Sequence, residues 1–261
     1  MKKANIYSSD GEKKGETELP KVFSTRFNSA LINKAVLISQ SQERQPYGSN
    51  KLAGLRTSAH YHGKRHYRFT MMNKEMSRIP RIHGKVGYMN YRARAAPQAV
   101  KGRKAHPPKA EKIWAKIINK KEEKAALMSA LSASANLKRV QERGHKTEET
   151  PIIFDNDFEA IEKTKQVSLL LNKLLKNEMQ RCKKKKVRAG KGKTRGRKYR
   201  KKKGPLIIVS KNSSILESAK NIAGVDVVSL DNLKIQDIAP GAQAGRLLLL
   251  SEQALQKLEK W

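Results

Sequence analysis

The residues Leu206-Ile207-Ile208-Val209 form an unbroken apolar run between a lysine-rich stretch and the polar pair Ser210-Lys211. Three similar short runs lie at residues 152–154, 225–228 and 247–250, and each is followed by apolar residues at helical spacing. Continuous apolar runs of this length are typical of strands buried on both faces of a parallel sheet, with helices as crossovers. The sequence therefore predicts an α/β fold, with a globular body in which a mostly parallel sheet is flanked by helices.

Turn and helix signals complete this outline. Asp10-Gly11 separates short extended segments at residues 4–7 and 15–19, so a hairpin is expected there. Apolar spacing predicts helices over residues 28–42, from about residue 113 through 137, from a cap at 155–157 through 175, over 215–222, near Leu233, and over 252–260.

A long segment, Arg44 to Lys109, interrupts this body. It carries sixteen lysines and arginines against the single acid Glu75, together with five of the six histidines and six aromatic residues. Without apolar periodicity it has no core of its own, and a connection of this length is either functional or disordered. The aromatic side chains indicate that this segment stacks on the surface of a partner, so we expect a long, extended, basic loop.

A second basic segment, Arg181 to Lys203, holds fifteen bases and no acid. The formal net charge is +34 and the two segments account for all but +4 of it, so the rest of the chain is nearly neutral. We therefore expect residues 1–43 to form the first part of the body, residues 44–109 the loop, and residues 110–261 the remainder of the body, including the basic tract 181–203.

Such a charge needs a polyanion, with nucleic acid the leading partner and an anionic membrane the second. Membrane association is disfavoured because neither segment has a continuous apolar helical face and no run approaches the ~20 apolar residues of a membrane span. No apolar signal core follows the N-terminus. Cys182 is the one cysteine, which excludes internal disulfides and fits a reducing cytoplasm.

Two glycine-rich stretches could suggest nucleotide binding. Gly190-Lys191-Gly192-Lys193-Thr194 is similar to a phosphate loop, but Val187 stands where the first glycine of that motif belongs, and lysines precede it instead of a buried strand. The stretch from Gly241 to Gly245 precedes a predicted strand, whereas a dinucleotide turn follows one. A flexible RNA-binding tract and a plain turn are the favoured interpretations.

Other candidates for chemistry are also weak. His60, His62 and His66 could bind zinc, but no cysteine or carboxylate accompanies them, so contacts to phosphates or stacking on bases are favoured. The acids Asp155, Asp157, Glu159 and Glu162 lie where a helix begins and where acids are favoured as caps. Lysines 183–186 are expected to lower the pKa of Cys182, although a bystander thiol is favoured. We expect no catalytic, cofactor or metal site, and no enzyme.

Several stretches resemble the family of the fourth protein of the large ribosomal subunit, in its archaeal and eukaryotic form. They are Gln45-Pro46-Tyr47-Gly48, the segments 53–59 and 97–108, Arg78-Ile79-Pro80-Arg81, Arg143-Gly144-His145, the segments 188–193 and 195–199, Ala239-Pro240-Gly241 and Gly245-Arg246. The resemblance spans nearly the whole chain.

The resemblance implies a structural, cytoplasmic component of the large ribosomal subunit. Its body would lie on the outer surface of that subunit, while its loop enters the large ribosomal RNA (rRNA) and its tip helps form the constriction of the polypeptide exit tunnel. The implied partners are large-subunit rRNA, neighbouring large-subunit proteins and the nascent polypeptide, with no membrane and no homo-oligomer. The alternative is a non-ribosomal RNA-binding or RNA-processing protein.

Basic side chains of both segments are expected to contact rRNA. They are Arg44, Lys51, Arg56, Arg78, Arg81, Arg92, Arg94, Lys101, Arg103 and Lys104 in the loop, and Arg188, Lys191, Lys193, Arg195, Arg197, Lys198 and Arg200 in the tract. The expected tip comprises His60, Tyr61, His62, Gly63, Lys64, Arg65, His66, Tyr67 and Arg68. Residues 60–77 depart from the Gly-rich turn of the family, being longer, bulkier and more basic.

Overall fold

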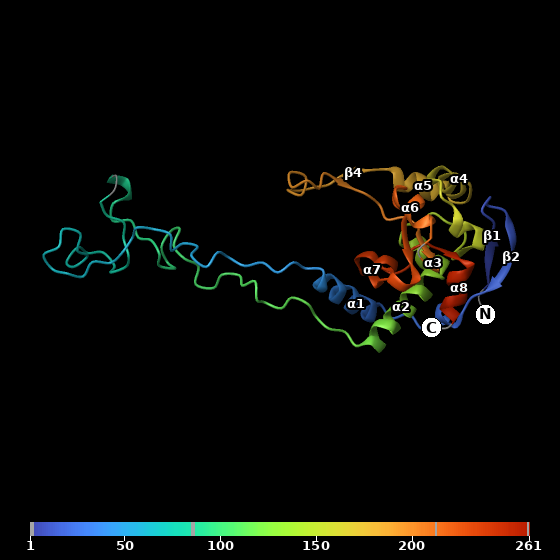
Figure 1. Ribbon diagram of the computed structural model, residues 1–261, viewed down its shortest axis with the longest axis horizontal. Helices are drawn as coiled ribbons and strands as arrows, with labels where there is room; N and C mark the ends of the chain where they lie inside the picture. The colour runs from blue at the N-terminus through green and yellow to red at the C-terminus, as the bar shows by residue number, and fades with distance from the viewer. Residues whose placement is uncertain (1–2, 85–86, 212, 260) are drawn as a thin grey trace. The chain divides into compact units, whose positions relative to one another are not determined.

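The computed structural model describes residues 3–84, 87–211, 213–259 and 261 (Figure 1). The chain divides into two compact units. The body consists of Met1–Glu43 and Ala115–Trp261, and the second unit, which we call the loop unit, consists of Arg44–Trp114. None of the helices in the described part of the chain combines the length and the apolar character needed to cross a bilayer.

The body is built on a six-stranded sheet with the order β2-β1-β3-β8-β6-β7. Its strands are β1 (Lys3–Tyr7), β2 (Lys13–Glu18), β3 (Ile152–Phe154), β6 (Leu206–Val209), β7 (Asp226–Ser229) and β8 (Leu248–Ser251). All neighbouring strands are parallel except β1 and β2, which form an antiparallel hairpin at one edge. The predicted α/β fold with a mostly parallel sheet is confirmed.

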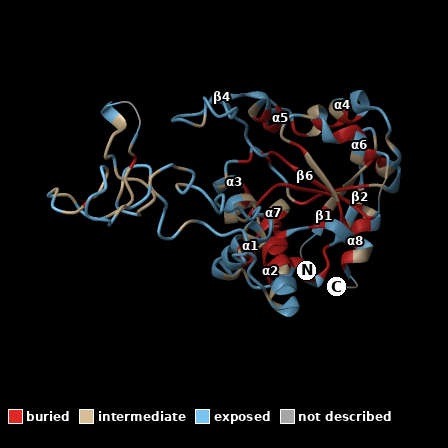
Figure 2. Ribbon diagram, turned by 60° about the vertical axis from the view of Figure 1, so that its left-hand side comes forward, coloured by how far each residue is buried: buried red, intermediate tan, exposed pale blue. Residues whose placement is uncertain are grey.

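Helices cover both faces of this sheet, which explains the continuous apolar runs. In β6, Leu206 and Ile208 face one core and Ile207 and Val209 face the other, and all four are fully buried. Burial of one such side chain stabilises the fold by roughly 1.5–3 kcal/mol. Figure 2 shows the buried residues gathered on the strands and on the inner faces of the helices.

The two cores differ in their helices. The first core contains α1 (Ser29–Gln42), α2 (Lys120–Ser134), α7 (Ile235–Ile238) and α8 (Glu252–Glu259). The second contains α3 (Leu137–Glu142), α4 (Thr164–Leu174), α5 (Lys176–Lys183) and α6 (Ile215–Lys220). The sheet is therefore the middle layer of a three-layer body.

The packing of α1 against α2 fixes where the chain leaves the body and returns to it. The backbone N–H of Asn28 donates to Ser129 Oγ of α2 (2.8 Å), and the Asn28 side chain accepts from the backbone of Leu31 (3.1 Å). At the other end of α1, Ser41 Oγ accepts from the backbone N–H of Lys116 (3.0 Å). Buried alanines of α2 permit this close approach.

Most of the predicted elements are present. The hairpin, the helix over 28–42 and all four strands are confirmed, with β7 and β8 beginning one residue later than expected. The closing helix ends at Glu259 within the described residues, and Lys260 lies outside them.

Two predicted helix starts are wrong. The chain is not helical at residues 113–119, where Ile113 and Ile117 are 86% and 90% exposed. A helix of one or two turns is marginal unless an apolar face packs against a partner, and the side chains of Ile113 and Ile117 are exposed instead. The helix expected from 155–157 begins only at Thr164, because Phe158 first enters the core in a 3₁₀ turn and stacks on Phe154.

Strand β6 supports a direct test of this fold. Ile208 is fully buried between its neighbours Val228 and Leu250, so Ile208→Ala is expected to lower the free energy of unfolding by about 2–5 kcal/mol. The matched control is Ile117→Ala, which should change it by less than about 0.5 kcal/mol because that side chain is 90% exposed. Urea unfolding followed by circular dichroism measures both, and equal effects would contradict the assigned core.

Candidate nucleic-acid interface

The basic tract begins in the last turn of α5 and continues as a hairpin. Its two short strands are β4 (Lys186–Val187) and β5 (Tyr199–Arg200), which pair antiparallel, and the N–H of Arg188 donates to the carbonyl of Lys198 (2.8 Å). The seven side chains expected to contact rRNA here are all exposed: Arg188, Lys191, Lys193, Arg195, Arg197, Lys198 and Arg200. The tract therefore presents its charge to solvent.

The phosphate-loop interpretation has no structural support. The glycines Gly190 and Gly196 both have φ of +76°, as expected for turns at a hairpin tip. The strand before them is exposed and no helix follows them within the tract, whereas a phosphate loop joins a buried strand to a helix N-terminus.

A buried ionic network holds the first end of the tract. The carboxylate of Glu178 is completely buried and accepts hydrogen bonds from Arg181 Nε (2.8 Å), His145 Nδ1 (2.7 Å) and the backbone N–H of Lys146 (3.0 Å). Arg181 also donates through Nη2 to the carbonyl of Lys203 (2.7 Å). One guanidinium thus joins α5 to the last residue of the tract.

The protonation states of this network follow from burial and hydrogen bonding. Burial alone would raise the pKa of Glu178, but the bonds from His145, Arg181 and the Lys146 backbone outweigh it and lower that pKa to about 2. Burial lowers the pKa of His145 despite its bond to Glu178. The hydrogen bond to Glu178 raises the pKa of Arg181. The ion pair is therefore Glu178 with Arg181, and His145 is a neutral donor.

A buried arginine holds the other end of the tract. Arg246 is 1% exposed and donates to the carbonyls of Gly204 (2.8 Å) and Asp237 (2.7 Å), and it pairs with the carboxylate of Asp226. Lys203 Nζ reaches the same Asp226 oxygen (2.7 Å). The tract therefore enters β6 through a fixed junction.

Sequence reasoning missed these anchors. The family-like stretches Arg143-Gly144-His145 and Gly245-Arg246 contain three of the residues, but neither stretch was assigned a role within the body. Arg143 donates to the carbonyl of Pro240 (3.1 Å), and burial, then the charges of Arg246 and Arg181, lower its pKa to about 10. The available signal for these anchors was their position beside glycines in predicted turns. Their burial, however, depends on segments that are distant in the chain.

Most of the predicted loop contacts are exposed in the loop unit. They are Arg44, Lys51, Arg56, Arg78, Arg92, Lys101, Arg103 and Lys104. The other two, Arg81 and Arg94, are half-buried and donate to carbonyls of the loop itself. Arg81 reaches Ser77 (3.1 Å) and Tyr91 (2.9 Å), and Arg94 reaches Val100 (3.0 Å). These two arginines therefore also shape the loop.

Two glycines let separate segments of the loop unit lie against each other. Gly54 has φ of +80°, and a Cβ there would lie 2.5 Å from the backbone nitrogen of Arg103. A Cβ on Gly102 would lie 2.0 Å from the carbonyl oxygen of Ala96. A side chain at either position would push these backbone segments apart. The two glycines therefore permit the close backbone packing within the loop unit.

An aromatic group closes the ends of the loop unit. The guanidinium of Arg44 lies 3.9 Å from the centroid of the Trp114 ring, and the ring of Tyr47 lies nearly parallel to it at 6.0 Å. Cation–π contacts of this kind contribute about 0.5–1 kcal/mol at exposed sites. Trp114, expected in a helix, therefore joins the two ends of the loop unit.

The expected tip is exposed except for His62, which is half-buried. His60 and His62 lie together with His83, whereas His66, which the sequence grouped with the first two, is not part of that cluster. These three imidazoles are the residues of the described chain that could hold a metal ion.

The remaining chemical candidates have structural roles. Asp155 caps the 3₁₀ turn by accepting from the backbone of Asn156, and Glu159 accepts from the backbone N–H of Ser210 (2.8 Å). Cys182 is buried, and burial raises the pKa of its thiol to about 11, so the expectation that its lysine neighbours lower that pKa is wrong. The lysine side chains reach solvent while the thiol faces the core.

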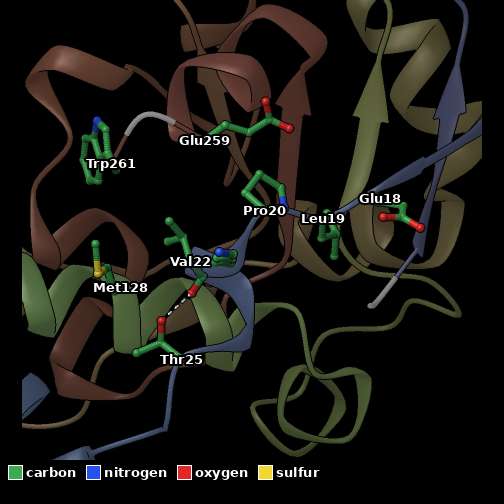
Figure 3. Close-up of a pocket in the computed structure, with 9 residues that line it drawn as sticks. Glu18, Leu19, Pro20, Val22, Thr25, Met128, Glu259 and Trp261 are labelled. Atoms are coloured by element: carbon green, nitrogen blue, oxygen red, sulfur yellow. Dashed lines mark hydrogen bonds between the residues drawn. The ribbon is translucent and has the colours of Figure 1, made fainter.

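A cavity of about 540 Å³ lies in the body between the chain after β2 and the C-terminus. In Figure 3, Val22 lies in the middle of the view, with Met128 and Trp261 to its left and Leu19 to its right. The hydroxyl among its lining residues, that of Thr25, donates to the carbonyl of Val22 (3.0 Å). That hydroxyl is therefore already engaged with a backbone carbonyl.

Removing the buried carboxylate tests the anchor of the tract. Glu178→Gln preserves shape but leaves the Arg181 guanidinium without its counter-charge, so the free energy of unfolding at pH 7 is expected to fall by roughly 3 kcal/mol. The matched control Glu217→Gln changes an exposed carboxylate of α6 and should change stability by less than about 0.5 kcal/mol. Equal stability of the two variants would contradict the anchor.

The pH dependence supplies a second readout of the same change. Because the pKa of Glu178 is depressed when folded, its contribution is complete above the unfolded pKa of ~4.3 and is lost as pH falls toward about 2. His145, buried neutral, begins to destabilise the fold below ~6.5, where the unfolded chain takes up a proton. The Glu178→Gln variant should therefore lose less stability than the wild type between about pH 4.5 and 2, whereas Glu217→Gln should follow the wild type.

Comparison with known proteins identifies the chain's relatives. A model of the Ribosomal protein L4/L1 family matches residues 17–261. A protein of Methanococcus aeolicus named large ribosomal subunit protein uL4 is 43% identical over 263 residues, covering 99% of each chain. Proteins of the same name from Natronomonas pharaonis (43% identical, 97% of each chain covered) and Nanoarchaeum equitans (42% identical, 98% of this chain and 97% of the relative covered) are also similar. These matches confirm the resemblance indicated by the sequence motifs, and the chain belongs to the Ribosomal protein L4/L1 family.

Proposed function

We propose that this chain is a structural constituent of the large ribosomal subunit that binds large-subunit rRNA and supports subunit assembly. Through its loop unit it helps line the polypeptide exit tunnel. Membership of the Ribosomal protein L4/L1 family and the names of its relatives support a ribosomal, non-enzymatic role. The chain works in the cytoplasm as part of the large subunit.

The observation that carries this proposal is the exposed, uncompensated charge of the two basic segments. Fifteen of the seventeen expected contact residues are exposed, and the other two are half-buried. In the part of the chain the structure describes, the ion pairs of the basic tract involve Arg181 and Lys203 at its ends. The side chains between these ends remain available for phosphate oxygens, which arginine binds through a forked pair of donors and lysine as a point charge.

The two units contribute differently to binding. The half-buried Arg181 and the buried Arg246 hold the two ends of the tract, so it presents a pre-organised surface whose ordering cost is already met by folding of the body. The loop unit buries few apolar side chains, chiefly Met71 and Ile82. The rRNA therefore supplies much of the free energy that orders it.

The proposed partners are those that membership of the family implies. Large-subunit rRNA contacts both segments, neighbouring large-subunit proteins contact the body, and the nascent polypeptide passes the tip of the loop unit. The alternative is a non-ribosomal RNA-binding or RNA-processing protein, and an RNA-processing enzyme requires a catalytic group. The acids, the thiol and both glycine-rich stretches have structural roles or lack the context that catalysis needs.

Salt dependence of RNA binding tests the role of the tract. The quadruple variant Lys191→Gln, Lys193→Gln, Arg195→Gln and Arg197→Gln removes four exposed charges. Each lost phosphate contact reduces the slope of log K against log salt by roughly 0.7–0.9, so the slope should become about 3 units shallower and the affinity for an rRNA fragment should fall. Filter binding or fluorescence anisotropy at several salt concentrations measures both quantities.

The control replaces four exposed lysines of the body, Lys121, Lys124, Lys165 and Lys220, by Gln. It makes the same change in net charge away from the tract. The proposal expects the slope of this control to match the wild type. Equal losses in both quadruple variants would mean that the tract makes no specific phosphate contacts.

A further inference from the structure

Three imidazole rings from two separate segments of the loop unit lie together. Pairs among His60, His62 and His83 have ring centroids 4.1, 4.3 and 4.6 Å apart, with interplanar angles of 71–75°. One ring nitrogen from each residue lies within 4.8 Å of those of the other two. No carboxylate or cysteine belongs to this group of the described residues.

The backbone explains why these three rings converge. His60 and Arg81 form an antiparallel bridge, with N–H···O distances of 3.3 and 3.1 Å. Residues directly opposite in such a pair share a face, and so do residues two apart along each extended segment. His60, His62 and His83 therefore point to one side. The N–H of Met71 donates to the carbonyl of His62 (3.1 Å), which helps to hold the segment that carries His60 and His62.

The hydrogen bonds leave ring nitrogens directed at one another. His60 Nδ1 lies 3.0 Å from the carbonyl of Ser58, which accepts from its N–H and leaves Nε2 as an electron-pair donor. His62 Nε2 and His83 Nε2 are 3.2 Å apart. A carbonyl that accepts from the far nitrogen is the usual support of a metal-binding histidine.

We propose that His60, His62 and His83 form a Zn²⁺ site with a fourth position open to water. Bonds of about 2.0–2.1 Å to zinc place the ligand nitrogens of a tetrahedron about 3.3–3.4 Å apart. The His62–His83 separation already has this value within 0.2 Å. His60 needs to approach by at most about 1.5 Å, which rotation of an exposed side chain provides.

The surroundings support a ligand that the polypeptide itself does not supply. His83 Nδ1, which is not the ring nitrogen that faces His62, is buried without a hydrogen-bond partner among the described residues. Phe69 packs against His83 and Tyr67 against His62, which limits the motion of both rings.

The nearby bases set the expected affinity. Lys64, Arg65 and Arg68 lie in the same segment, and three neutral imidazoles do not offset the charge of Zn²⁺. The affinity should therefore be micromolar and weaker than that of cysteine-rich zinc sites. The proposal revises the expectation that the chain has no metal site, and it does not depend on the proposed ribosomal function.

Titration of the full-length protein with Zn²⁺ tests this site. The chain is freed of metal with a chelator, and Zn²⁺ is added in competition with a chromophoric zinc indicator. One equivalent should bind, and His60→Gln, His62→Gln and His83→Gln should each weaken binding by about 10- to 100-fold or more. Co²⁺ in place of Zn²⁺ should give the intense visible absorption of tetrahedral coordination, and each variant should abolish it.

The matched controls are His66→Gln and His106→Gln, two exposed histidines of the loop unit outside the cluster. Both should bind Zn²⁺ as the wild type does, and far-ultraviolet circular dichroism should show an unchanged body in all variants. Absence of one-equivalent binding in the wild type overturns the proposal. Binding that survives when His60, His62 and His83 are all replaced by Gln in one variant overturns it as well. Binding that depends equally on His66 also overturns it.

Discussion

Uncompensated positive charge is the constraint on which the rest of this structure depends. The two basic segments hold thirty-one bases and one acid, so their charges have no counterions within the segments. A core cannot accommodate these side chains, because a buried charge without a partner costs several kcal/mol. The chain instead places most of its buried apolar residues in the three-layer body, and most basic side chains of the two segments are exposed.

The few buried charges lie at the junctions between the body and the tract. Arg181 with Glu178, and Arg246 with Asp226, bind the two ends of the tract to α5 and to the start of β6. Replacement of a buried ion pair by apolar residues is often neutral or stabilising. These pairs therefore contribute direction more than stability. A guanidinium that donates to fixed carbonyls sets the path of the chain, whereas an apolar contact is not directional.

The sequence predicts the fold well where local pattern and tertiary environment agree. Leu206 to Val209 are buried on both faces, so an unbroken apolar run suffices to predict β6. At residues 113–119 the same reasoning failed, since the apolar spacing of Ile113 and Ile117 is helical but no surface packs against them. Helical periodicity predicts a helix only when the tertiary structure supplies a partner for its apolar face.

The candidate sites were less predictable, because they depend on contacts between residues far apart in the chain. Exposure of the basic side chains follows from composition, but the burial of Arg246, Glu178 and His145 depends on elements more than thirty residues apart. The histidine cluster is a similar case. The sequence indicates His60 and His62 as neighbours, whereas His83 joins them only through the bridge between His60 and Arg81.

The most direct test of the central claim is fractionation of a cell lysate on a sucrose gradient in high salt, with the chain detected by immunoblotting. A protein held by many phosphate contacts and integrated into the particle should sediment almost entirely with the large ribosomal subunit. Recovery of most of the chain in the soluble fractions at the top of the gradient would contradict the account.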